Sequence, residues 1–370
     1  MLWADAICID QQNIEERGKQ VQLMGMIYWK ADRVLVWLGQ NIAENDRLIN
    51  VEEAFAWICE SNMIFKAKEE VCGDAKEVPP VTSDDIAGLT ELEVDRWEAV
   101  SILLSSPWFR RVWVMQEIGL AAEALVFCGD AEIEAAELLD FYLWVMGSGQ
   151  ALYNHFFIHL TQQTVWYEYW LATRPEYKTV AEKSTKLSFI EVLAFARRLE
   201  ATGPRGHVFT FLGHPAALRF LLGREAAAGV GYGSIISLGT KPLIQPDYAK
   251  SLGEIYTGFV VEVFEATHNL DLLSYIIHFE NSIEEVIPSW VPRWDLPGGS
   301  HVSLGTDHQS KYYNASRGSY PTSPTFIKSN ELNGLSGLRL GALFVDRIEW
   351  TYGITMPVWT CFALLKYDFA

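Results

Sequence analysis

A helix that we predict to begin at Pro107 carries three side chains that could do chemistry together. Arg110, Trp113 and Glu117 recur at positions i, i+3 and i+7, so a cation, an aromatic ring and a carboxylate would project from one face. A carboxylate beside an aromatic wall can stabilise the positive charge of a sugar oxocarbenium ion. The spacing alone favours a simpler interpretation, in which a solvated Glu117 pairs with a nearby arginine and Trp113 belongs to the core.

Other familiar catalytic and ligand-binding patterns are absent or weak. The sequence has no phosphate loop, no G-x-S-x-G elbow and no H-E-x-x-H helix. His155 and His159 have a spacing that could bind a metal, but the residues between them are apolar and no acid accompanies them. They are better interpreted as ordinary histidines of the core or surface, and we expect neither a metal nor a resident cofactor.

The elements that would position a site begin with an alternation of strand and helix. Leu2–Ile9 is a short apolar run that predicts a buried strand, a helix capped by Asn13 follows, and Arg33–Leu38 predicts a second strand. Such a βαβ unit has two parallel strands and a right-handed crossover. Ligands bind beyond the carboxyl ends of parallel strands, which places Asp10 and Gln11 at a cleft.

Farther along the chain, the same alternation continues and then changes. Residues 91–104 and 107–120 predict helices, and Ala124–Cys128 predicts a strand, as in an open α/β sheet. Beyond 147 the pattern becomes one of helices rich in aromatic residues, one of them starting at a Ser251–Glu254 capping box. Residues 223–239 are rich in Gly, Ala and Ser and predict a flexible loop, whereas 341–348 is strand-like.

Composition narrows the class of protein. The 370 residues are 49% hydrophobic and 21% charged, which is typical of a folded globular chain of two to three domains. Lys and Arg number 29 against 47 Asp and Glu, a net charge of −18 that disfavours nucleic acid and anionic lipid as partners. Five scattered cysteines and the lack of a long apolar run predict a reduced, soluble, cytoplasmic protein without a membrane span.

Two blocks of the sequence resemble a known family. The segment Leu2-Trp3-Ala4-Asp5-Ala6-Ile7-Cys8-Ile9-Asp10-Gln11, extended by Tyr28 and by Val34-Leu35-Val36-Trp37-Leu38-Gly39, resembles the heterokaryon-incompatibility (HET) domain of filamentous fungi. Residues 107–117 are similar to the P-W-F-x-R-x-W-x-x-Q-E signature of that family. The segments 201–205, 246–248 and 288–292 resemble stretches that commonly follow the domain, so the resemblance reaches about residue 295.

The resemblance implies a role in fungal non-self recognition and regulated cell death, and a fold similar to that of TIR domains. Many TIR domains cleave NAD with a glutamate that follows a tryptophan by four residues, a spacing that Trp113 and Glu117 match. It therefore implies an ionised, catalytic Glu117 with NAD as substrate. The residues expected to bind NAD are Trp113, together with Arg110 from helical spacing and Asp10 and Gln11 from sheet topology. The alternatives are a non-catalytic module that assembles with itself or with other incompatibility or signalling proteins, and an inactive, truncated relic.

From these patterns we expect two regions. Residues 1–146 would form an α/β domain with a TIR-like (flavodoxin-like) open parallel sheet, and 147–370 a mostly helical extension with an irregular or β-rich end. Family members usually begin with an additional strand that precedes the first block, and this sequence lacks it. It also has Gly203-Pro204-Arg205-Gly206 where D-P-R-D is usual, which removes two acidic partners of Arg205.

Overall fold

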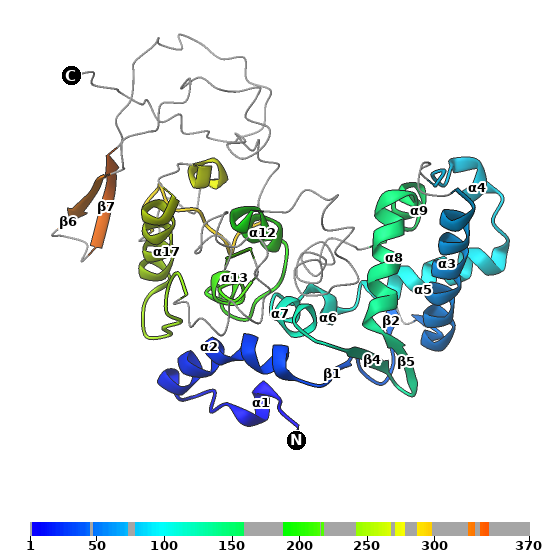
Figure 1. Cartoon of the computed structure of the whole chain (residues 1–370), viewed down its shortest axis with the longest axis horizontal. Coiled ribbons are helices and arrows are strands. Elements are labelled where there is room, and N and C mark those ends of the chain that lie inside the picture. Colours follow the sequence, from blue (N-terminus) through cyan, green and yellow to red (C-terminus); the bar gives the residue numbers. More distant parts are fainter. Residues whose placement is uncertain are drawn as a thin grey trace, which may run out of the picture.

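A three-stranded sheet lies at the centre of the first 158 residues (Figure 1). The strands are β1 (Val34–Trp37), β4 (Ala124–Cys128) and β5 (Ala131–Glu134), in the order β1-β4-β5. β1 and β4 are parallel, whereas β4 and β5 form an antiparallel hairpin. The computed structural model describes residues 2–44, 47–72, 78–158, 188–214, 216–217, 242–267, 271–277 and 287–297, and the backbone of 325–329 and 334–339.

The predicted first strand is wrong. Residues 2–9 contain a single helical turn, α1 (Asp5–Cys8), and Leu2 and Ile7 are 77% and 82% exposed. Asp5 starts this turn by accepting a hydrogen bond from the amide of Ala6 at 2.8 Å, a local contact that competes with an extended backbone. Ile9 alone among these residues is buried, so the run lacks the two-sided burial of a central strand.

The parallel neighbour of β1 is therefore β4, with Val34 opposite Ala124 and Trp37 opposite Phe127. The predicted βαβ unit made from residues 2–38 does not form, because α2 (Ile14–Lys30) leads into β1 without a paired strand before it. The described residues thus show a mixed α/β fold with a small open sheet that contains one parallel pair.

Helices α3, α5, α8 and α9 form a layer beside β5 (Figure 1). Their bounds are Val51–Cys72, Glu91–Leu104, Ala135–Gly147 and Gln150–Phe156, with the short α4 (Ser83–Ala87) beside them. Large aromatic rings fill the space between these helices, in particular Trp57, Trp97, Phe141, Trp144 and Phe156. A small hairpin of β2 (Ala43–Glu44) and β3 (Arg47–Leu48) precedes α3.

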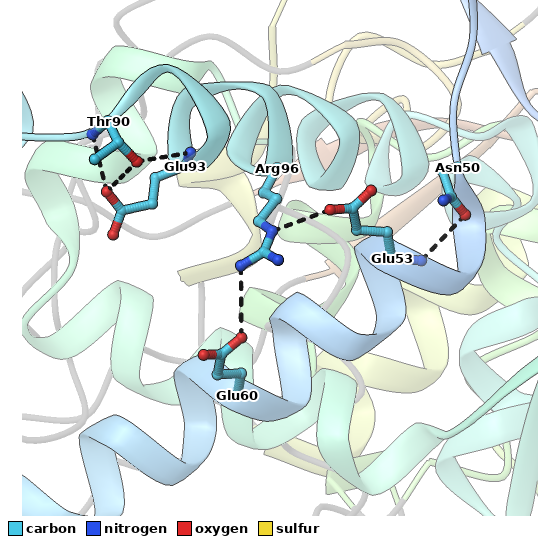
Figure 2. A network of polar contacts seen from close by, with 6 residues as sticks. All are labelled: Asn50, Glu53, Glu60, Thr90, Glu93 and Arg96. Atoms are coloured by element: carbon cyan, nitrogen blue, oxygen red, sulfur yellow. Dashed lines mark hydrogen bonds and ion pairs between the residues drawn. The ribbon is translucent and has the colours of Figure 1, made fainter.

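An arginine on α5 fixes the position of α3 (Figure 2). The Arg96 guanidinium lies 3.1 Å from a Glu53 carboxylate oxygen and 3.7 Å from one of Glu60, and it covers the Trp57 ring at 5.0 Å. The Asn50 side chain accepts a hydrogen bond from the Glu53 amide at 3.3 Å and so caps the start of α3. These contacts hold the first turn of α3 against α5.

Several helices start with a reciprocal capping box, in which a hydroxyl and a carboxylate satisfy each other's backbone amides. The predicted Ser251–Glu254 box is confirmed. Further boxes join Thr82 to Asp85, Thr90 to Glu93 (Figure 2) and Ser188 to Glu191. These helix starts are encoded locally, which explains why the predicted bounds of α5 agree with the structure.

The described part of the C-terminal region combines helices with irregular segments and one β-hairpin. It contains α12 (Phe189–Ala196), α13 (Gly206–Phe209), α17 (Leu252–Thr267) and a 3-10 helix at Asp271–Tyr275, followed by an antiparallel hairpin of β6 (Thr325–Ser329) and β7 (Gly334–Arg339). The predicted loop 223–239, the strand-like segment 341–348 and His159 lie outside the described residues. No helix in the described ranges has the length and apolarity needed to cross a bilayer.

Candidate functional site

The helix predicted from Pro107 is two short helices, α6 (Pro107–Arg110) and α7 (Val114–Gly119). Between them Arg111 is extended, and the backbone on either side of it pairs with a distant residue. The Val112 amide donates to the Glu200 carbonyl at 2.8 Å, and the Glu200 amide donates to the Arg110 carbonyl at 2.6 Å. Pairing to Glu200 interrupts the helix. The predicted single helix is therefore wrong, and Arg110 lies outside the helix of Glu117. Trp113 remains one turn before Glu117, whose amide donates to the Trp113 carbonyl at 3.2 Å.

Arg110 and Trp113 point to the C-terminal region. The Arg110 guanidinium lies 3.4 Å from a Glu200 carboxylate oxygen. Trp113 is half-buried, and a Cβ built on Gly206 would lie 3.3 Å from its indole nitrogen. Arg205, which lacks the usual acidic neighbours, donates to the Lys250 carbonyl instead. The glycine at 206 thus permits a close approach to the Trp113 ring.

Glu117 lies in the first turn of α7, partly buried, near the charges of Arg111 and Asp5. Burial raises the pKa of Glu117 to about 7, the positive charge of Arg111 opposes this rise, and the negative charge of Asp5 adds to it. The Glu117 carboxyl therefore holds its proton to a higher pH than an exposed glutamate does.

Tyr28 of α2 completes this group, which we call the Glu117 cluster: Asp5, Tyr28, Arg111 and Glu117. Burial, with Glu117 and then Asp5 adding to its effect, raises the pKa of Tyr28 well above its ordinary value. The phenol therefore keeps its proton at neutral pH and can donate it in a hydrogen bond. Trp3 packs edge-on against Tyr28, with ring centroids 5.6 Å apart, and covers this side of the cluster.

Asp10 and Gln11 follow α1 and not the carboxyl end of a strand, so their predicted placement is wrong. The Gln11 side-chain amide donates to the Asp5 carbonyl at 3.1 Å, which brings Gln11 beside the Glu117 cluster. Asp10 accepts a hydrogen bond from the Gln12 amide at 3.0 Å and thereby shapes the turn before α2. Gln11 is thus near Glu117 through Asp5, while Asp10 serves the turn.

The Glu117 cluster lies on the amino-terminal side of the sheet. Helices α2 and α7 lead into the amino ends of β1 and β4 through the short loops 31–33 and 120–123. A cavity of about 720 Å³ lies on the other side, at the carboxyl ends of the same strands, and Glu117 is not among its lining residues. Within the described residues, no three His, Cys, Asp or Glu side chains gather as a metal site.

Asp5, Tyr28 and Arg111 are residues of the cluster that analysis of spacing did not identify. All three belong to the residues on which the family resemblance rests, and Arg111 is the arginine of P-W-F-x-R. Helical spacing pointed to its neighbour Arg110. The family signature, and not the helical spacing, therefore indicates which arginine lies near Glu117.

Comparisons with known proteins find a family match in the first part of the chain, which contains the Glu117 cluster. Residues 1–117 match the family described as heterokaryon incompatibility protein (HET), a match that ends at Glu117. The heterokaryon incompatibility protein 6, OR allele, of Neurospora crassa is 30% identical over 147 residues, which cover 35% of this chain and 20% of that protein. The chain thus matches about a fifth of the length of this relative. No solved structure matches the chain. Residues 1–117, which contain the Glu117 cluster, are therefore similar in sequence to the heterokaryon incompatibility family.

Proposed function

We propose that this chain acts in heterokaryon incompatibility, as a component of non-self recognition that leads to cell death, and that Glu117 cleaves NAD. The family match of residues 1–117 and the name of the Neurospora relative support the first part. The second part depends on one observation: a partly buried carboxyl, with its pKa raised to about 7, lies near a cation and a protonated phenol. Raised pKa values of this kind gather at catalytic sites.

The proposed reaction converts NAD and water into nicotinamide, ADP-ribose and a proton. The bond between the ribose C1′ and the nicotinamide nitrogen breaks, and its electron pair leaves with nicotinamide. Ionised Glu117 stabilises the positive charge that develops on the ribose ring. Water then adds to C1′ and releases the proton.

The neighbouring side chains have distinct proposed roles. Arg111 favours the ionised form of Glu117 and takes the place that sequence spacing assigned to Arg110. The Tyr28 hydroxyl donates a hydrogen bond to a ligand oxygen. Gln11 and Trp113 border the bound substrate.

The test is nicotinamide release by the purified full chain between pH 6 and 9. Glu117→Gln keeps the size of the side chain and removes its charge, and we expect it to lower the rate by about 100-fold or more. Glu123→Gln, which breaks only the exposed ion pair with Arg33, is the matched control and should retain the wild-type rate. Equal release by wild type and Glu117→Gln would remove Glu117 from the mechanism.

The pH profile tests the neighbours. If the rate requires ionised Glu117, it rises with pH through about 7 in the wild type. Asp5→Asn removes a negative charge and shifts this rise to lower pH, while Arg111→Met removes a positive charge and shifts it to higher pH. Two shifts in the same direction would contradict the arrangement.

A second candidate function, assembly without catalysis, is favoured by the exposed side of β1. Leu35 and Trp37 are 58% and 57% exposed, on a strand that pairs along one side only in the described sheet. Such an edge can accept another strand. Trp37→Lys should then abolish self-association in light scattering. A folded wild-type chain that neither releases nicotinamide nor associates would instead be the inactive relic.

A further inference from the structure

The cavity at the carboxyl ends of β1 and β4 is a second site, independent of Glu117. Three segments line this open pocket, which has a volume of about 720 Å³: the loop after β1, the first turns of α3, and the turn between β4 and β5. Pockets of about 300–1,000 Å³ suit small organic ligands, and the carboxyl ends of parallel strands are where open α/β sheets bind them. The cavity is too large for a bare metal ion.

Its lining has a definite charge. Glu52, Asp130 and Glu132 supply carboxylates, and Gln40, Asn41 and Asn50 supply amides, while no Lys, Arg or His of the described residues lines it. None of the three carboxylates forms an ion pair with another described residue. The neighbouring Glu53 differs, because it forms an ion pair with Arg96 (Figure 2).

The remainder of the lining is apolar. Ile49, Val51 and Phe55 come from the start of α3 and the residues before it, and Cys128 and Ala131 from the hairpin. Val51, Phe55 and Cys128 are buried, so they form the floor, whereas the carboxylates are exposed at the rim. A ligand that matches both parts has an apolar body and a positive charge at its end.

The rim is held by backbone geometry. Gly39 and Gly129 end the two parallel strands with positive φ angles of 119° and 56°, and the Gly129 amide donates to the Gly39 carbonyl at 3.0 Å. A Cβ on Gly129 would lie 2.9 Å from the Gln40 carbonyl oxygen, so a glycine is needed for this approach. Together with the fixed start of α3, this makes the cavity a preformed feature.

We propose that this cavity binds a small organic cation, a primary amine attached to an aromatic body. The ammonium group would lie among the carboxylates of Glu52, Asp130 and Glu132, and the ring would lie on Phe55 and Val51. Anions, including phosphorylated ligands, are repelled by the same carboxylates, which distinguishes this site from the NAD site proposed at Glu117.

Binding of three probes of similar shape tests the charge preference: phenethylamine, phenethyl alcohol and phenylacetate, each titrated into the full chain by calorimetry. We expect the amine to bind most tightly, the alcohol more weakly and the acid not at all, with amine affinity falling as salt rises. Glu132→Gln should weaken amine binding about threefold, and Glu132→Gln with Asp130→Asn about tenfold. Glu134→Gln, two residues along β5 and outside the lining, should leave it unchanged. Equal binding of amine and acid would overturn the proposal.

A steric variant and the cysteines locate the binding. Ala56 is exposed and lines the cavity, so Ala56→Trp should fill it and abolish amine binding, while Met63→Trp, exposed on the same helix, should have no effect. Bound amine should also slow alkylation of Cys59 and Cys128, which line the cavity, but not of Cys8 and Cys72. Alkylation at pH 9 suits these thiols, because burial raises the pKa of both Cys59 and Cys128. Amine binding that survives Ala56→Trp and protects no cysteine would place it elsewhere and reject this site.

Discussion

The guanidinium of Arg17 lies over the ring of Tyr248, 3.8 Å from its centroid. This contact joins α2, in the HET region, to a segment more than 200 residues away that also follows the domain in the family resemblance. Next to it, Gly18 approaches the backbone so closely that a Cβ would lie 2.7 Å from the Pro246 carbonyl oxygen. Residues 242–250 are thus fitted to α2.

Loss of the Arg17 charge should weaken this junction. Arg17→Met keeps an apolar side chain but removes the cation above the Tyr248 ring, and we expect the free energy of unfolding to fall by about 1 kcal/mol. Lys19→Met is the matched control, because Lys19 is exposed and pairs only with Glu15 in the same helix. Chemical denaturation of both variants provides the measurement, and an equal effect of the two changes would contradict the prediction.

The titration of Glu117 should make stability depend on pH. Its pKa is raised from 4.5 to about 7 in the folded chain, so the folded state binds more protons than the unfolded state between these values, and this carboxyl lowers stability as pH rises through that window. Glu117→Gln should therefore be more stable than the wild type at pH 8, by about 3 kcal/mol, and equally stable near pH 4. Denaturant titrations at both pH values measure this, and a variant that is less stable at pH 8 would refute it.

Substitution of Asn62, which joins α3 to α8, should strongly lower the stability of the protein. It is 1% exposed, its amide donates to the Glu137 carbonyl at 2.9 Å and to its carboxylate at 2.6 Å, and its oxygen accepts from the Trp144 indole at 3.1 Å. Asn62→Leu leaves these groups unpaired, and we expect a loss of about 2–3 kcal/mol. Asn154→Leu, at an exposed position of α9, should change stability by less than about 0.5 kcal/mol, as thermal or chemical unfolding would report.

Gly129→Ala should destabilise the turn between β4 and β5. The positive φ of 56° and the 2.9 Å approach to the Gln40 carbonyl both act against a side chain, for a total cost of about 1–3 kcal/mol. Gly147→Ala is the control, because the position is at the end of α8 and a Cβ there meets nothing within 4 Å. Comparable stability of the two variants would show that the turn tolerates a side chain.

Elements with local signals could be predicted from the sequence, and those that depend on distant partners could not. The strand Ala124–Cys128 and the helix Glu91–Leu104 have their predicted bounds, because an apolar run closed by Gly129-Asp130 marks the strand and a capping box starts the helix. The run at residues 2–9 had no such signal, since a short apolar segment has the same composition in a buried strand and in an exposed turn. The helix from Pro107 is broken by the backbone of Glu200, which no local pattern reveals.

The residues of the candidate site also differ in whether the sequence could identify them. Glu117 was identified both from helical spacing and from the family signature. Arg110 was chosen from helical spacing alone, and the break between α6 and α7 removes that spacing. The proximity of Asp5 and Tyr28 to Glu117 results from the packing of α1 and α2 on α7, which requires the tertiary structure. The cavity was missed because its walls come from three separate segments.

The pairing of β1 with β4 also affects the order in which parts of the fold form. The ion pair between Arg33 and Glu123, just before these strands, joins residues 90 positions apart, and α3 to α7 lie within that loop. Helices with capping boxes form within about a microsecond. Closing the loop between Arg33 and Glu123 costs chain entropy, and this cost is offset only when β1 and β4 pair. The helical layer around Trp97 is therefore expected to assemble before the strands meet, so the cavity at the carboxyl ends of β1 and β4 would be among the last parts of this region to form.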